Sequence, residues 1–147
     1  MSYFEIAIYQ PRREANIGTL WRSAYQLGAA GLKTIGRPYQ RQSSDTAHAA
    51  QRLPFRAYLT FEEFQRELPP EAVLVAVEMG GIPLSQFSHP PCAVYLLGSE
   101  ANGLPRRVLA ACQALVTIEA VRDLSYNVAV AGSIVMYQRV FAGHPAS

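Results

Sequence analysis

Three short segments combine glycines with amide, hydroxyl and charged side chains in patterns that a scaffold seldom needs. The first, residues 16–22 (NIGTLWR), comes shortly after an apolar run at residues 4–9. Asn16 and Arg22 are six residues apart, a little under two helical turns, so both side chains can face the same cleft. The guanidinium of an arginine can grip a phosphate through two parallel hydrogen bonds. Taken alone, the segment is explained more simply as a helix cap followed by a solvated arginine.

The second segment, residues 96–105 (LLGSEANGLP), is a turn bracketed by glycines between an apolar run and a predicted helix. Such a turn exposes backbone N–H groups beside a helix N-terminus, which suits an adenine edge, a carboxylate or a phosphate. Gly98 and Gly103 allow a ligand to approach the backbone closely, or allow a left-handed conformation. An ordinary strand-to-helix turn explains the segment equally well in isolation.

The third segment, residues 124–132 (LSYNVAVAG), opens a predicted helix. Ser125 or Asn127 can cap that helix, and both side chains would then lie near the preceding loop. Ala129, Ala131 and Gly132 are small enough for another backbone to pack very close. The alternative without chemistry is a well-capped helix at a tight interface.

These segments depend on a framework in which short apolar runs alternate with helical patterns. Two of the runs, residues 72–77 and 93–97, are nearly continuously apolar, which is typical of parallel strands buried on both faces. The alternation predicts an α/β domain with a mostly parallel sheet flanked by helices. The predicted strands are residues 4–9, 32–35, 55–59, 72–77, 93–97 and 115–118.

The predicted helices have recognisable ends. Asn16 is expected to cap the first helix, which ends at the glycines and alanines of residues 28–31. Thr60 and Glu63 form a predicted capping box, and Pro105 suits the first turn of a later helix. Other expectations are a short helix around residues 45–51, a final helix over residues 127–141 and a loose tail after residue 142.

The composition is that of one small domain covering residues 1–147. A chain of this length buries roughly 70% of the surface that its unfolded form exposes, so its core needs no metal or disulfide. Charged residues make up 16% of the chain, below the roughly 25% of an average globular protein, and this makes an obligate dimer plausible. Twelve arginines accompany a single lysine, Lys33. Arginine suits phosphate and base contacts, although a GC-rich genome explains the same bias.

Neither metal nor redox chemistry is indicated. Cys92 and Cys112 have no ligand or redox spacing, and both are predicted to be reduced, buried fillers, as expected of a cytoplasmic protein. The histidines have no recognisable partner pattern; they are His48, His89 and His144. No signal peptide and no apolar run of membrane-spanning length is present.

Together, the three segments resemble the three motifs of the SPOUT superfamily, and specifically its TrmH-like branch of RNA 2′-O-methyltransferases. The pattern N-x-G-x-x-x-R is matched by Asn16, Gly18 and Arg22; G-x-E-x-x-G-L by Gly98, Glu100, Gly103 and Leu104; S-x-N-V-x-V-A by Ser125, Asn127, Val128, Val130 and Ala131. Each motif alone is weak evidence, but three in order over residues 4–141 are strong evidence.

The resemblance implies a parallel α/β sheet whose C-terminal part, about residues 72–141, forms a trefoil knot, an exception to the rule against knotted chains. It also implies that S-adenosyl-L-methionine (SAM) binds bent in the knot as methyl donor, without a metal. The chain lacks a G-x-G-x-x-G loop after its first strand, which argues against a Rossmann-type cofactor site. The implied cofactor-binding residues are Val77, Glu78, Leu97, Gly98, Gly103, Ile118, Leu124, Ser125 and Asn127.

The resemblance further implies a homodimer in which the first motif of one subunit faces the SAM of the other. The first and last helices would pack across the two-fold axis and bury residues such as Trp21 and Tyr137. The family assigns Arg22 the role of accepting the 2′-OH proton with help from a substrate phosphate. Because a guanidinium remains charged, the alternative that we favour is that Arg22 holds the phosphate and stabilises the developing alkoxide. The remaining implied catalytic residues have supporting roles: Asn16 orients the ribose or phosphate, Glu100 holds a basic group, and Ser125 and Asn127 fix the third motif.

The chain departs from the pattern in two respects. Tyr126 replaces the usual leucine or methionine between Ser125 and Asn127, which should leave the backbone contact intact. RNA-binding extensions are absent, so the chain is similar to the minimal stand-alone enzymes that act on the wobble ribose of tRNA. RNA, with tRNA favoured over rRNA, would therefore contact exposed arginines of the domain itself; the candidates are Arg12, Arg13, Arg22, Arg37, Arg41, Arg52 and Arg56.

Three alternative functions remain at this stage. The same knotted fold could methylate a base instead of a ribose. A knotted dimer could bind RNA or SAM without turnover, although the motif residues are all present. A hydrolase could use Ser99 in its glycine-flanked turn, but a G-x-S-x-G elbow is missing.

Overall fold

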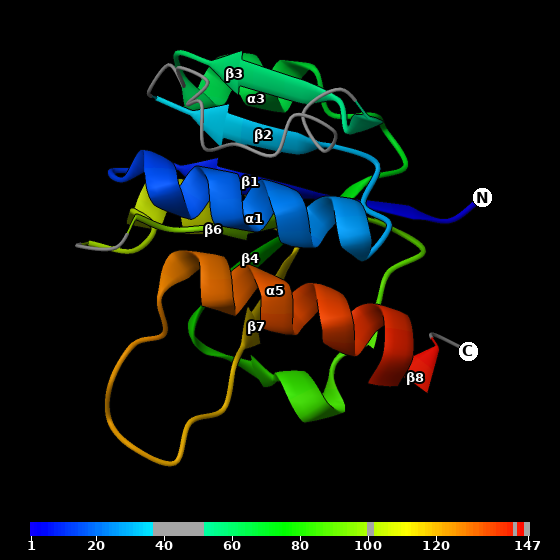
Figure 1. The fold of residues 1–147 in the computed structure, drawn as a ribbon, viewed down its shortest axis with the longest axis vertical. Helices are drawn as coiled ribbons and strands as arrows, with labels where there is room; N and C mark the ends of the chain where they lie inside the picture. Colours follow the sequence, from blue (N-terminus) through cyan, green and yellow to red (C-terminus); the bar gives the residue numbers. More distant parts are fainter. Residues whose placement is uncertain (37–51, 100–101, 143, 146–147) are drawn as a thin grey trace.

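The computed structural model describes residues 1–36, 52–99, 102–142 and 144–145 (Figure 1). Their strands are β1 (Tyr3–Tyr9), β2 (Leu32–Ile35), β3 (Phe55–Tyr58), β4 (Val73–Pro83), β5 (Ser88–His89), β6 (Cys92–Leu97), β7 (Ala114–Thr117) and β8 (His144–Pro145). Their helices are α1 (Glu14–Gln26), α3 (Phe61–Arg66), the 3-10 turn η1 (Leu84–Gln86), α4 (Arg106–Ala110), α5 (Val128–Tyr137) and the π-helical turn η2 (Gln138–Ala142). The predicted helix at residues 45–51 lies outside the described residues.

Six strands form one sheet in the order β3-β2-β1-β6-β4-β7, and every neighbouring pair is parallel. The central strand β6 has all six residues buried, in agreement with its continuously apolar sequence. The predicted α/β class is confirmed. Because the strands are parallel, their carboxyl ends share one edge of the sheet, and the loops carrying the three segments leave from that edge.

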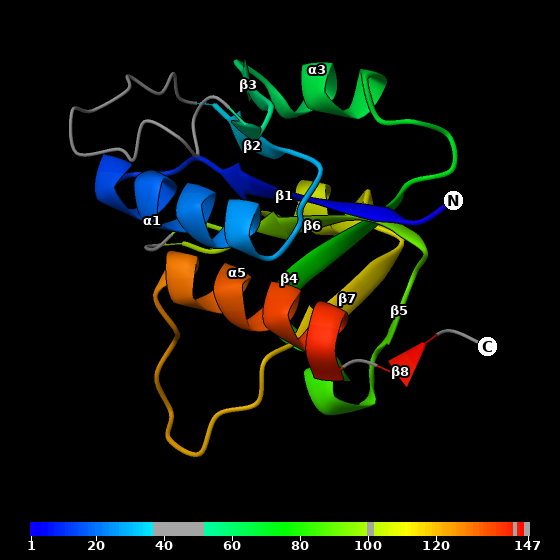
Figure 2. The ribbon, with the colours of Figure 1, turned by 45° about the vertical axis from the view of Figure 1, so that its right-hand side comes forward.

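The helices cover the two faces of the sheet and create two cores (Figures 1 and 2). Alternate residues of β1 divide between them: Phe4, Ile6 and Ile8 join the core under α1 and α5, while Ala7 and Tyr9 join the core under α3 and α4. Helices α1 and α5 lie side by side on one face. Their close approach depends on Gly132, where an added Cβ would lie 2.5 Å from Leu20 Cδ1.

The first helix begins earlier than the sequence pattern predicted. Helix α1 begins at Glu14, and its N-cap is Arg13, which makes no side-chain cap hydrogen bond. The prediction that Asn16 caps this helix is therefore wrong. Glu14 in the first turn stabilises the helix dipole instead. Asn16 lies within the first turn, and its Oδ1 accepts a hydrogen bond from Asn127 rather than from the start of its own helix.

Other helix ends agree more closely with the predictions. Thr60 Oγ1 accepts from the Glu63 backbone N–H at 3.2 Å, while the Glu63 carboxylate accepts from Leu59 N rather than Thr60 N. Pro105 is the N-cap of α4, one residue before the predicted first turn. Asn127 caps α5, as predicted.

The end of the chain departs from the expected loose tail. Helix α5 continues into the π-helical turn η2, and the backbone of β8 then pairs in parallel with β5. The final helix therefore ends as α-helix at Tyr137 rather than at Phe141.

A buried polar network fastens this C-terminal turn to the sheet. His89 Nδ1 lies 2.5 Å from Tyr95 Oη, and His89 Nε2 contacts Gln138 Oε1. Arg139 Nη1 donates to Tyr95 Oη at 3.0 Å, and Gln138 Nε2 donates to the Leu84 carbonyl at 3.2 Å. All these groups are satisfied if His89 is neutral and carries its proton on Nε2, because Tyr95 O–H can then donate to Nδ1.

We expect this network to make stability depend on pH. Burial lowers the pKa of His89 from its ordinary 6.5, and the nearby charge of Arg139 lowers it further, although the hydrogen bond to Gln138 opposes this. The unfolded chain therefore takes up the proton first, so stability that is present above pH 6.5 is lost as pH falls below it. Urea unfolding between about pH 7 and about pH 5 should show a falling free energy for the wild type and a flatter profile for His89→Gln. Parallel profiles would contradict the role of His89.

Candidate functional site

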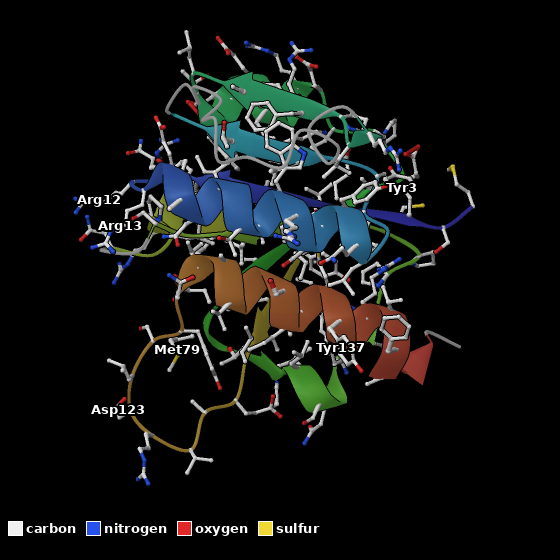
Figure 3. All side chains as sticks on the ribbon, in the orientation of Figure 1. Tyr3, Arg12, Arg13, Met79, Asp123 and Tyr137 are labelled. Carbon is white, nitrogen blue, oxygen red and sulfur yellow. The ribbon has the colours of Figure 1, made fainter. Side chains whose placement is uncertain are left out.

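A cavity of about 870 Å³ opens beside the middle of β4 and the carboxyl ends of β6 and β7. Figure 3 shows Met79 and Asp123, two of its lining residues, at the end of the molecule where Arg12 and Arg13 also lie, whereas Tyr3 lies toward the other end. Three stretches of chain supply the lining: residues 77–79 after the first part of β4, residues 97–99 and 102–104 after β6, and residues 117–126 after β7, with Val128 and Ala131 of α5.

The first wall of the cavity is a bulge in β4. Val77 and Ile82 both pair with Val116 of β7, so residues 78–81 leave the regular ladder between them. Thr117 holds this bulge from β7: its hydroxyl donates to the Glu78 carbonyl at 2.6 Å and accepts from Gly81 N at 2.7 Å. The bulge directs Glu78 toward the cavity instead of into the sheet.

Removing the Thr117 hydroxyl should destabilise the β4 bulge that forms the first wall. Thr117→Val keeps the shape of the side chain but leaves the Gly81 N–H and the Glu78 carbonyl without their partner. We expect a loss of about 1–3 kcal/mol in the free energy of unfolding, because half-buried groups left unsatisfied are costly. Chemical denaturation of the variant and the wild type measures the effect. An unchanged free energy of unfolding would mean that the bulge does not depend on Thr117.

The second wall is the turn between β6 and α4. Gly103 has a φ of +65°, and its N–H donates to the Ser99 carbonyl at 3.1 Å. Glu78 Oε2 accepts from Leu104 N at 3.0 Å, which ties this turn to the β4 bulge. A Cβ at Gly98 would lie 2.5 Å from the Gly103 carbonyl carbon, and a Cβ at Gly103 would lie 2.4 Å from Glu78 Oε2. Only glycine allows the turn to close in this way.

The third wall is the loop of residues 119–126. All eight of its residues line the cavity. Its outer side chains include Val121, which is fully exposed, and Leu124, which is 83% exposed. Ser125 lies in this loop and lines the cavity.

Asn127 joins the third motif to the first. Its Oδ1 accepts from Ala129 N at 2.8 Å and from Val130 N at 3.2 Å, which caps α5. Its Nδ2 donates to Asn16 Oδ1 of α1 at 3.1 Å. The two asparagines are 111 residues apart in sequence but adjacent in space, beside the cavity rather than inside it.

Arg22 lies on the exposed surface of α1 and makes no hydrogen bond or ion pair with any residue that the structure describes. It does not line the cavity of its own chain, and neither does Asn16. Arg12 and Arg13 are also exposed. The sequence candidates Arg37, Arg41 and Glu100 lie outside the described residues.

The structure brings eight of the nine predicted cofactor residues into one lining: Val77, Glu78, Leu97, Gly98, Gly103, Ile118, Leu124 and Ser125. Asn127 is the exception, because its amide is used in the α5 cap and the Asn16 contact.

The prediction that Trp21 is buried in a subunit interface is wrong. Trp21 is 6% exposed and stacks on Phe55 of its own chain at 4.8 Å, so it cannot bury itself in a subunit interface. Tyr137, in contrast, is exposed.

Several residues of the site were not predicted from the sequence: Thr117, Glu119, Met79 and Ser85. Thr117 ends a strand where a hydroxyl could hold a neighbouring strand, but nothing local indicates that its partner is a bulge 36 residues away. Ser85 lies on η1 outside the cavity and acts through Glu119.

The cavity does not support a hydrolase. Ser99 lines it and accepts a hydrogen bond from Asn102 N at 3.4 Å, but none of the described residues that line it is a histidine. Within the described ranges no group of three or more histidine, cysteine or acidic side chains could hold a metal ion. Cys92 is buried and Cys112 half-buried, and both are free thiols. No helix in the described part of the chain has the length and apolarity needed to cross a bilayer.

Comparison with known proteins gives a consistent result. Residues 3–137 match the SpoU rRNA Methylase family. A tRNA (cytidine(34)-2′-O)-methyltransferase of Ancylobacter novellus is 30% identical over 148 residues, an alignment that covers 89% of this chain and 87% of that protein.

Solved structures share the fold. One that concerns the 2-OH methylation of C/U34 on tRNA is 28% identical, covers 93% of both chains and superposes with a TM-score of 0.78. An AdoMet-bound rRNA methyltransferase from Sinorhizobium meliloti is 27% identical with a TM-score of 0.79; the match covers 97% of this chain and 59% of that longer one. The expected fold class is confirmed, including the C-terminal knot, which belongs to the fold of these methylases.

Proposed function

Because the chain belongs to the SpoU rRNA methylase family, we propose that it transfers a methyl group from SAM to a ribose 2′-hydroxyl of tRNA, at nucleotide 34. The observation that carries the proposal is the cavity, which gathers the predicted cofactor residues from three separate loops. The named activities of the relatives at 28–30% identity support the choice of tRNA and of the ribose. Such an enzyme would act in the cytoplasm.

The lining residues fit SAM. Val77, Leu97, Ile118 and Val128 provide apolar walls, and the middle of β4 and the ends of β6 and β7 provide backbone N–H and carbonyl groups that an adenine edge requires. A volume of about 870 Å³ is within the range of cofactor sites. Bound there, SAM would supply a methyl group already activated by its sulfonium. The protein's own task is therefore to align the ribose and stabilise its oxygen.

Arg22 is the residue we assign to that stabilisation. Its guanidinium stays charged in proteins, so it would hold a phosphate of the tRNA and the developing alkoxide rather than accept the proton. Asn16 would orient the ribose or phosphate from a position fixed by Asn127. Glu100 would hold a basic group in place, and Ser125 would fix the loop against the cofactor.

A homodimer would bring these groups to the cavity. Arg22 and Asn16 do not line the cavity of their own chain, so we propose that they face the SAM of a second subunit. The outer side of α5 and η2 exposes Val130, Tyr137 and Phe141, the last at 67% exposure. Exposed apolar side chains that follow one another along α5 and η2 in this way are typical of a permanent interface.

The tRNA would reach the site across a basic surface. Arg12 and Arg13 are exposed at the end of the molecule where the cavity opens (Figure 3). Arg41 remains a candidate from the sequence alone. Contacts of this kind position the phosphate backbone without reading the bases.

Labelled SAM and tRNA test the proposal. Incorporated label that resists alkaline hydrolysis at nucleotide 34 supports ribose methylation, since a 2′-O-methyl blocks cleavage of the adjacent phosphodiester. Label at a bond that hydrolyses normally would favour base methylation. Binding of SAM and tRNA without incorporation would favour a non-catalytic binding module.

A further inference from the structure

The cavity loop of residues 119–126 is held at its base. Its middle, residues 120–125, makes one backbone hydrogen bond among the described residues, from Leu124 N to the Arg122 carbonyl. The exposed side chains of Val121 and Leu124 bury little surface that could fix the loop. The position of this wall therefore depends on the contacts of its two end residues, Glu119 and Tyr126.

Glu119 fastens the first end to η1. Its carboxylate accepts a short hydrogen bond from Ser85 Oγ, and both carboxylate oxygens lie 3.4 Å from Ser85 N. The Ser85 hydroxyl lowers the pKa of Glu119 below its ordinary value, so the carboxylate remains charged and able to accept. Because η1 directly follows β4, this contact relates the loop to the strand that carries the first wall.

Tyr126 closes the second end onto the first. Its hydroxyl donates to the Glu119 carbonyl at 2.7 Å, so the eight-residue loop returns to its own starting point. The next residue, Asn127, begins α5 and contacts Asn16. Tyr126 thus joins the end of the cavity loop to the N-cap of α5, whose Asn127 contacts Asn16 of α1. A leucine or methionine at this position could not make the contact.

We propose that Ser85, Glu119 and Tyr126 form a latch that positions the 119–126 loop against SAM. They are positioning residues, because they act through the loop and not on the reacting atoms. The inference rests on the proposed function and deepens it. Tyr126, which departs from the family pattern, would replace packing at this position by a directed hydrogen bond.

The latch should affect cofactor binding more than catalysis. A loop whose ends are already fixed loses less conformational freedom when the ligand binds, so the latch lowers the dissociation constant for SAM. Once SAM is bound, its own contacts order the loop, so turnover at saturating SAM should change little. The expected signature is a raised KM for SAM with a nearly unchanged kcat.

Calorimetric titration with SAM and steady-state kinetics on tRNA test this with single-hydroxyl variants. Tyr126→Phe should raise the Kd and the KM for SAM by about 3- to 10-fold, the size expected for one net hydrogen bond, with kcat within about 2-fold. The matched control is Tyr3→Phe, which removes a surface tyrosine hydroxyl bonded to Glu71 at 2.8 Å and should leave both constants unchanged.

Glu119 supplies a conservative rescue. Glu119→Ala and Ser85→Ala should raise the Kd for SAM by about 3- to 10-fold, whereas Glu119→Gln, which keeps an acceptor for Ser85, should stay within about 2-fold of wild type. Wild-type affinity in Tyr126→Phe and Glu119→Ala would overturn the latch, as would an equal loss in Tyr3→Phe. Failure of the wild-type protein to bind SAM would instead overturn the proposed function.

Discussion

Replacing Arg22 by alanine should lower kcat on tRNA by about 10²–10³-fold while leaving SAM affinity and folding intact. The reason is electrostatic: a preorganised positive group beside a developing alkoxide stabilises the transition state by roughly 3–4 kcal/mol. Arg22 is exposed on α1 and has no hydrogen-bonding partner among the described residues, so its removal should not disturb the monomer. Single-turnover methyl transfer at saturating SAM measures the effect.

Arg66→Ala is the matched control for this prediction. Arg66 is an exposed arginine in the last turn of α3, on the face of the sheet opposite α1. The Arg66→Ala variant should show near-normal turnover. This result would show that the effect of Arg22→Ala comes from the position of Arg22 and not from the loss of one positive charge. A rate for Arg22→Ala close to the wild-type value would remove the role assigned to Arg22.

The second large effect is expected at Gly98. A Cβ there would lie 2.5 Å from the Gly103 carbonyl carbon, and a backbone atom cannot move aside as a flexible side chain would. Gly98→Ala should therefore displace the second wall of the cavity, weaken SAM binding by about 10²-fold or more, and cost about 1–3 kcal/mol of stability. Calorimetric titration and urea unfolding of the same preparation measure the two effects.

Gly28→Ala is a control for backbone strain alone. Gly28 ends α1 with a φ of +86°, but an added Cβ there would have nothing within 4 Å. It should cost roughly 1–2 kcal/mol of stability and leave the Kd for SAM unchanged. If Gly98→Ala bound SAM as tightly as Gly28→Ala, the closed turn would not be part of the cofactor site.

The strands could be predicted because burial on both faces leaves a continuous apolar signal. The central strand β6 and the first half of β4 agree with the predicted runs within one residue. Periodicity alone could not predict that β4 continues to Pro83, because its bulge at residues 78–81 contains a glutamate and two glycines. The pairing that makes it a strand comes from β7, more than thirty residues later.

The motifs predicted many of the residues that line the cavity, but they did not predict the contacts that hold its walls together. Gly98 and Gly103 were noted for close backbone approach, and the structure gives the reason: they pack against each other and against Glu78. The contacts that hold the walls together, from Glu78 to Leu104 N and from Thr117 to the bulge, join residues 26 and 36–39 positions apart. Such long-range contacts leave no local pattern in a single sequence.

Two of the wrong predictions have tertiary causes. Asn16 has the side chain of a helix cap, but the chain already turns into the helix at Arg13, so its amide pairs with Asn127. Trp21 was expected at a subunit interface because it lies on the first helix, which the family resemblance implies packs across the two-fold axis. It instead points into the sheet, where Phe55 of β3 stacks on its ring.

The most direct test of the account is complementation between two inactive variants. Arg22→Ala keeps the cofactor cavity and Gly98→Ala keeps the arginine, so a mixed dimer contains one complete site if Arg22 serves the cavity of the other subunit. Co-refolding equal amounts of the two variants should restore about a quarter of wild-type activity, since about half of the dimers are mixed and one of their two sites is complete. If the mixture is no more active than the two variants measured separately, the site is not shared between subunits.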